Sequence, residues 1–164
     1  AHEMVHAVMA RSTNWGSLAN DPDAAWLIEG AAEFIHGADE RVAADIAANG
    51  GGAAGRAAVA GALAGGFGGS SLDYSASYAA TRYLHDQIKQ AGGNGIKDVL
   101  GYLSANPSAT LNDAMANATR GLYANSGDFL SDYAANGAAF IATFDLANGM
   151  QHRLNKVIAQ LRND

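Results

Sequence analysis

The longest regular apolar pattern of the chain lies in residues 72–93, LDYSASYAATRYLHDQIKQAGG. Its large side chains, from Leu72 to Ile88, follow helical rather than alternating spacing, which places them along one side of an α-helix. Gly92 and Gly93 follow, and glycine commonly ends a helix. No segment of the sequence shows the period of two that is typical of a β-strand. We therefore expect a mainly α-helical fold.

Start and stop signals divide most of the remaining sequence into shorter helices. Asp21 and Pro22 predict the start of one helix, because proline fits the first helical position, and Gly37 predicts its end. Thr110 and Asp113 are placed as a capping pair at the start of another. With a loop expected over residues 12–20, the predicted helices cover residues 2–11, 22–36, 39–48, 96–106, 110–121, 128–144 and 151–163.

Residues 50–71 hold 9 of the 20 glycines of the chain. This composition predicts a low-complexity loop, or a short helix of small residues around residues 57–64. Such a segment could cover a cleft as a mobile flap or simply connect two elements. We expect a linker.

Composition narrows the classes of function. The 164 residues suffice for one domain, which we expect to span residues 1–164. The net charge of −6 and the lack of any Lys/Arg cluster argue against nucleic acid as a partner. No apolar run reaches the roughly 18 residues that a membrane span needs, so no membrane is expected as a partner. The absence of Cys excludes disulfides, thiolate catalysis and zinc held by Cys.

Two histidines bracket a glutamate in the first predicted helix, as His2-Glu3-Met4-Val5-His6. Positions i and i+4 of a helix lie one turn apart on the same face, so His2 and His6 can place two ring nitrogens on one metal ion. The carboxylate of Glu3 lies beside the first histidine, where it can reach a water molecule on the metal and act as a general base. This spacing predicts a zinc site.

A catalytic zinc ion keeps three protein ligands and one open position, so a third ligand is needed. The extended pattern with a third histidine would require Gly at position 9 and His at position 12, where this chain has Met9 and Ser12. A carboxylate from a second helix is the other common solution. Glu29 and Glu33 lie i, i+4 on the predicted second helix, and either could be the ligand.

Gly30 favours Glu29 over Glu33 as the third zinc ligand. A glycine inside a helix costs about 1 kcal/mol of helix stability. That cost is explained if the second helix must approach the first one closely at the metal.

The motif pair HEMVH and WLIEGAAE, residues 2–6 and 26–33, resembles the gluzincin metallopeptidases, and most of all the collagenase-like group. Two later segments are similar to the peptidase domain inserted in some bacterial flagellins, the flagellinolysins. They are YSASYAATRYLHDQIKQAGGNGIKDVLGYL and FIATFDLANG. The likeness spans about residues 2–148. It implies that His2, His6 and Glu29 bind zinc, that Glu3 is the general base and acid, and that Glu33 holds a ligand histidine.

The same resemblance implies a fold and a setting. It implies a zincin-type helical metallopeptidase domain, extracellular, on a bacterial flagellum, which hydrolyses protein or peptide substrates beside the flagellin subunits of the filament. The coiled-coil termini of flagellin are absent, and so is the strand that precedes the first helix of such peptidases. We therefore expect the chain to be a portion of a larger polypeptide that lacks the upstream strands.

A hydrogen-bond donor is expected to stabilise the developing oxyanion. Related peptidases commonly use a downstream Tyr or His, and Tyr74 and Tyr78 lie one turn apart in the matching stretch. Core packing is the alternative interpretation of both tyrosines. We expect His36 to be an exposed residue at a helix end, although it could also line the site.

Two other functions stay open. The chain could be a non-catalytic helical surface domain of a flagellin, with a structural or vestigial zinc site that recruits a fourth ligand such as His36. It could also be an ordinary helical domain in which the motif arises by chance and binds no metal.

Overall fold

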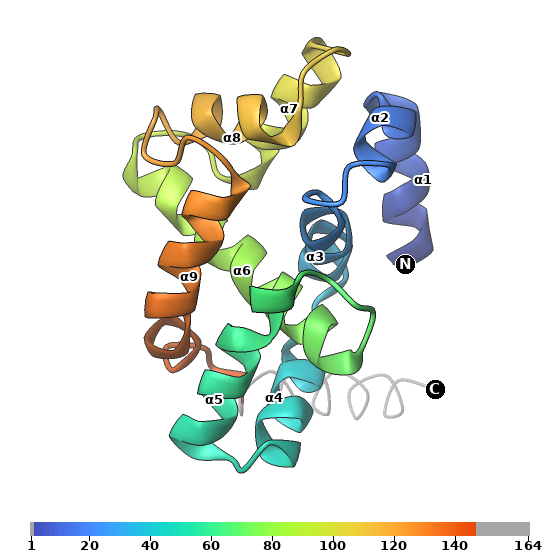
Figure 1. The fold of residues 1–164 in the computed structure, drawn as a ribbon. Helices are drawn as coiled ribbons and strands as arrows, with labels where there is room; N and C mark the ends of the chain where they lie inside the picture. Colours follow the sequence, from blue (N-terminus) through green and yellow to red (C-terminus); the bar gives the residue numbers. More distant parts are fainter. Residues whose placement is uncertain (1, 147–164) are drawn as a thin grey trace, which may run out of the picture.

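The computed structural model describes residues 2–146 and confirms the mainly α-helical prediction; it has no strand within that range. Figure 1 shows the arrangement of the helices. They are α1 (His2–Ser12), α2 (Trp15–Ala19), α3 (Ala25–His36), α4 (Asp39–Ala48), α5 (Gly52–Gly61), the 3-10 helix η1 (Ala62–Gly65), α6 (Ser71–Gln90), α7 (Ile96–Ala105), α8 (Leu111–Ala118) and α9 (Ser126–Ile141).

The long helix α6 lies in the middle of the fold, with α9 on one side and α3 on the other (Figure 1). It also contacts α4, α5 and α7. Many of its buried residues are small, including Ala76, Ala79 and Ala80, which are fully buried. Small side chains let neighbouring helices approach closely, so α6 can be the element on which the others pack.

Gly30 lies at a close contact between α3 and α6. A Cβ atom at this position would collide with the backbone carbonyl of Ser77 and with the hydroxyl of Thr81, both on α6. The predicted reason for this glycine, a close approach of α3 to α1 at the metal, is therefore wrong. Successive residues of a helix point about 100° apart, so Glu29 and Gly30 serve different neighbours.

The helix α1 lies along α3 at the edge of the molecule (Figure 1). Val5 and Met9 are its buried residues and join the hydrophobic core. This packing decides which face of α1 is turned toward α3, and it places His2 and His6 beside that helix.

The predicted boundaries hold for most helices. The pair Thr110 and Asp113 forms the predicted capping box of α8, in which each side chain accepts a hydrogen bond from the other residue's backbone N–H. The same arrangement, not predicted, starts α6 at Ser70 and Asp73. The helix predicted over residues 151–163 lies outside the described residues.

Three predictions about loops and boundaries are wrong. The expected loop over residues 12–20 contains the short helix α2. The helix predicted from Pro22 begins at Ala25, because residues 22–24 form a turn in which Asp21 accepts a hydrogen bond from the backbone N–H of Asp23.

The glycine-rich segment is the third correction. Instead of a linker it contains α5 and η1, and α5 packs against α4, α6 and α9. The alternative prediction, a short helix of small residues around residues 57–64, is confirmed, although the helix begins earlier, at Gly52. Gly55 lies directly against the backbone of Ile46, and Val59 is fully buried. Glycine here allows close helix contact, a use that composition alone does not distinguish from flexibility.

None of the helices in residues 2–146 is both long enough and apolar enough to cross a membrane.

Replacing Gly30 by Ala should lower the free energy of unfolding by about 1–3 kcal/mol or more, because the new methyl group overpacks a backbone contact. Gly101→Ala is the matched control, since a Cβ there has no neighbour within 4 Å. It should raise stability by up to about 1 kcal/mol, as expected for an exposed helical site. Urea unfolding followed by circular dichroism measures both; equal effects of the two substitutions would contradict this account of the α3–α6 contact.

Candidate metal centre

Three side-chain atoms converge where α1 meets α3. Nε2 of His2 lies 3.0 Å from Nε2 of His6 and 3.1 Å from Oε2 of Glu29, and Nε2 of His6 lies 3.3 Å from the same oxygen. Ligand atoms around a tetrahedral zinc ion, each about 2.0–2.1 Å from the metal, are about 3.3 Å from one another. The donor set and its spacing therefore fit one small ion such as zinc.

Each donor is placed by its helix. His2 and His6 occupy one face of α1, one turn apart, and Glu29 extends from α3 to meet both. The side chains of the three residues are 17–22% exposed, so the group is partly shielded but still reached by solvent. A catalytic metal needs access for water at one coordination position.

Glu33 lies behind His2. Its Oε1 is 3.0 Å from Nδ1 of His2, although the two groups lack the alignment of a hydrogen bond, and its side chain is only 5% exposed. The Nδ1 atom is the ring nitrogen that Glu29 does not contact. A carboxylate in this position commonly fixes the orientation of a ligand histidine.

The ring of His6 is held by fewer polar contacts than the ring of His2. Its Nδ1 is buried and has no hydrogen-bond partner within residues 2–146. The ring of Trp15 lies 6.0 Å from the His6 ring between centroids, and Trp15 also packs against the hydrophobic core. The second tryptophan, Trp26, is in the core instead, where its indole N–H donates to the hydroxyl of Ser126.

Glu3 is exposed and faces a cavity of about 390 Å³, which His2 also lines but His6 and Glu29 do not. The structure gives its carboxylate no hydrogen bond or ion pair with the described residues. The cavity is lined from four helices by His2, Glu3, Glu33, His36, Arg41 and Tyr74. His36 is thus an exposed residue at the end of α3, as expected, and also lines the cavity, but it is not among the three converging donors.

The structure separates the two candidate tyrosines. The Tyr74 ring lies 6.1 Å from the His2 ring and lines the cavity. Partial burial, and then the negative charge of Glu29, raise the pKa of Tyr74, so its hydroxyl keeps its proton at neutral pH.

Tyr78 is buried against a different group. Its hydroxyl donates to Oδ1 of Asp39 at 2.8 Å and accepts a hydrogen bond from Arg82 at 3.1 Å. Burial and the hydrogen bond to Asp39 raise the pKa of Tyr78 to about 12. This hydroxyl already has its partners, and Tyr78 is not among the residues that line the cavity.

Arg41 is a cavity residue that the sequence did not reveal. It is an isolated arginine in the predicted helix DERVAADIAA, where a solvent-exposed charge is the ordinary expectation. Only the packing of α4 near α3 and α6 brings it to the cavity.

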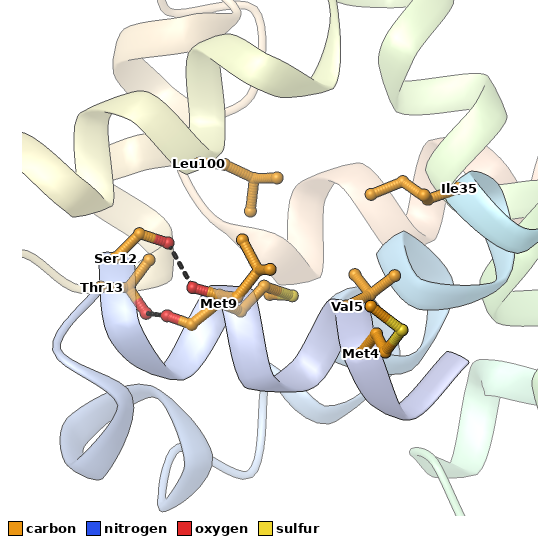
Figure 2. Close-up of a pocket in the computed structure, with 8 residues that line it drawn as sticks. Met4, Val5, Met9, Ser12, Thr13, Ile35 and Leu100 are labelled. Atoms are coloured by element: carbon orange, nitrogen blue, oxygen red, sulfur yellow. Dashed lines mark hydrogen bonds between the residues drawn. The ribbon is translucent and has the colours of Figure 1, made fainter. Parts of the chain in front are cut away.

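A second hollow lies along another side of α1 (Figure 2). It measures about 430 Å³ and is almost entirely apolar. Met4 and Val8 are exposed there, with 72% and 63% of their surface accessible. The hollow is lined by Met4, Val5, Val8, Met9, Ser12, Thr13, Ile35 and Leu100, and it shares no lining residue with the cavity at Glu3.

The chain matches no protein-family model, no curated protein sequence and no solved structure. The likeness to the gluzincins and flagellinolysins rests on the motif residues and stays a prediction.

Tyr78→Phe should lower the free energy of unfolding by about 1–2 kcal/mol, because it removes a hydrogen bond to a carboxylate. Tyr74→Phe is the matched control one turn away, and its hydroxyl has no hydrogen bond with the described residues. Its effect should stay within about 0.5 kcal/mol. Urea unfolding of both variants distinguishes the tyrosines, and a larger loss for Tyr74→Phe would contradict their assigned surroundings.

Proposed function

We propose that this chain is a zinc-dependent endopeptidase of the gluzincin type, in which His2, His6 and Glu29 bind the metal. The convergence of three donor atoms from two helices, 3.0–3.3 Å apart, carries the proposal. Bound zinc would supply a Lewis acid and would lower the pKa of a bound water to about 7. Glu33 would hold the ring of His2 in the orientation that the site needs.

Glu3 is the general base and then the general acid of this mechanism. It follows His2 by one residue, about 100° around α1, faces the cavity and has no competing partner within the described residues. Its carboxylate can take a proton from water as the peptide carbonyl is attacked and deliver it to the leaving amine. No covalent intermediate is needed.

Tyr74 is the better of the two candidates for an oxyanion donor. It lines the same cavity as Glu3, and its raised pKa keeps the hydroxyl protonated. The hydroxyl of Tyr78 is engaged by Asp39 and Arg82. A donor must be free to form its hydrogen bond as charge develops.

The proposed substrates are proteins or peptides, and the proposed setting is the extracellular surface of a bacterial flagellum, among the flagellin subunits of the filament. The setting rests on the likeness to the flagellinolysins. The mainly helical fold is compatible with an inserted surface domain.

The alternative is a non-catalytic flagellin surface domain with a structural or vestigial zinc site. A closed structural site would need a fourth protein ligand. His36 lines the cavity with His2, but the donors that converge are His2, His6 and Glu29 alone among the described residues. The lack of a fourth converging donor within residues 2–146 favours the peptidase.

Glu3→Gln should keep one zinc ion per chain and lower the cleavage rate of a quenched fluorescent peptide library by about 10²–10⁴-fold, because the base is removed and no ligand is. Asp23→Asn, at an exposed turn, makes the same chemical change away from the site and should leave both zinc content and cleavage unchanged. Elemental analysis gives the zinc content. Loss of zinc in Glu3→Gln, or undiminished cleavage, would contradict the role of Glu3.

Glu29→Ala and Glu33→Ala form a second test. Glu29→Ala removes a ligand and should abolish stoichiometric zinc binding, whereas Glu33→Ala should weaken it by about 10–100-fold, the usual cost of losing a residue that supports a ligand. Competition with a chromophoric chelator measures both affinities. The opposite order would exchange the two roles.

A further inference from the structure

We propose that Arg41 is a carboxylate-binding residue of the cavity beside Glu3, which makes peptides that present a carboxylate next to the scissile bond the preferred substrate class. The inference rests on the proposed peptidase function for its biological meaning. The binding that it predicts can be measured without catalysis.

The neighbours of Arg41 hold its guanidinium in place but leave hydrogen-bond donors of the group unpaired. The Nε atom lies 3.6 Å from Oε2 of Glu33, and the guanidinium carbon lies 5.2 Å from the centre of the Tyr74 ring. The side chain is 41% exposed. A planar cation that lies over an aromatic ring and beside a carboxylate is orientated on two sides.

The two terminal nitrogens of Arg41 are the part left available. The structure gives the guanidinium of Arg41 no hydrogen bond within residues 2–146, and its ion pair with Glu33 runs from Nε at 3.6 Å. An arginine whose task was only to neutralise Glu33 would be expected to use its fork of parallel donors. That fork matches the two oxygens of a carboxylate.

The charges around the cavity define where such a carboxylate can bind. Glu3 and Glu33 line the cavity, and Glu29 lies close enough to raise the pKa of Tyr74. Among the described residues, Arg41 is the one lysine or arginine that lines the cavity. Apart from the bound metal ion, which would itself attract anions, Arg41 is therefore the place in this lining that favours a substrate carboxylate, so the position of the acidic group along the substrate is selected.

The carboxylate could come from an acidic side chain or from the C-terminus of the peptide. The chemistry at Arg41 is the same for both. Two probes separate these sources: N-acetyl-glutamate α-amide carries only the side-chain carboxylate, and N-acetyl-alanine carries only the terminal one. N-acetyl-glutamine α-amide is the neutral match of the first probe.

The test is NMR titration of the three probes into the zinc-loaded full chain, with Arg41→Gln, Arg41→Lys and Arg11→Gln for comparison. Arg11 is exposed at the end of α1, outside the cavity, so Arg11→Gln makes the same change in net charge. At least one carboxylate probe should bind wild type about tenfold or more tightly than the neutral probe. Arg41→Gln should remove that preference, Arg41→Lys should keep part of it, and Arg11→Gln should keep all of it.

Several outcomes would overturn the inference. The first two are equal binding of the carboxylate and neutral probes, and no binding of any probe. The third is a carboxylate preference that survives in Arg41→Gln, because the carboxylate would then bind the metal instead of Arg41. A fall in zinc affinity as the sole effect of Arg41→Gln would make Arg41 a support for Glu33 and nothing more. Failure of the peptidase proposal has a different signature: the wild-type chain would cleave no peptide, while the carboxylate preference could still be measured.

Discussion

The packing of α3 between α1 and α6 is the constraint on which the candidate site depends. One side of α3 lies so close to α6 that residue 30 has no room for a side chain, and this contact fixes the position of the helix. Glu29 and Glu33 then extend from α3 toward His2. The same contact brings Tyr74 of α6 to the cavity. One helix pair therefore positions the proposed third metal donor, the proposed supporting carboxylate and the candidate oxyanion donor.

The helix α1 supplies the other half of the site and is held less firmly. Val5 and Met9 are its buried residues, while Met4 and Val8 on a neighbouring side are exposed in the apolar hollow of Figure 2. A ligand that binds only the folded arrangement adds its binding free energy to stability. Zinc held jointly by α1 and α3 would therefore fasten α1 to the rest of the fold, and metal binding and local order would be coupled.

Local patterns in the sequence were sufficient for most helices and for the pairing of His2 with His6, because helix periodicity and i, i+4 geometry depend on neighbours along the chain. Helix geometry alone did not separate Glu29 from Glu33, since both lie on one helix face, and the sequence argument for Glu29 rested on Gly30. The structure gives them different neighbours: Glu29 is beside both Nε2 atoms and Glu33 is beside Nδ1 of His2. The sequence was less informative about Gly30, the glycine-rich segment and Arg41, whose surroundings are made by helices distant in sequence.

The central claim is that His2, His6 and Glu29 form a single metal site, and anomalous diffraction at the zinc absorption edge, on crystals of the zinc-loaded chain, tests it most directly. The account predicts one strong peak within about 2.0–2.2 Å of Nε2 of His2, Nε2 of His6 and an oxygen of Glu29, with no fourth protein ligand. A peak on other residues, a fourth ligand from His36, or no peak at these three side chains at stoichiometric zinc would contradict it.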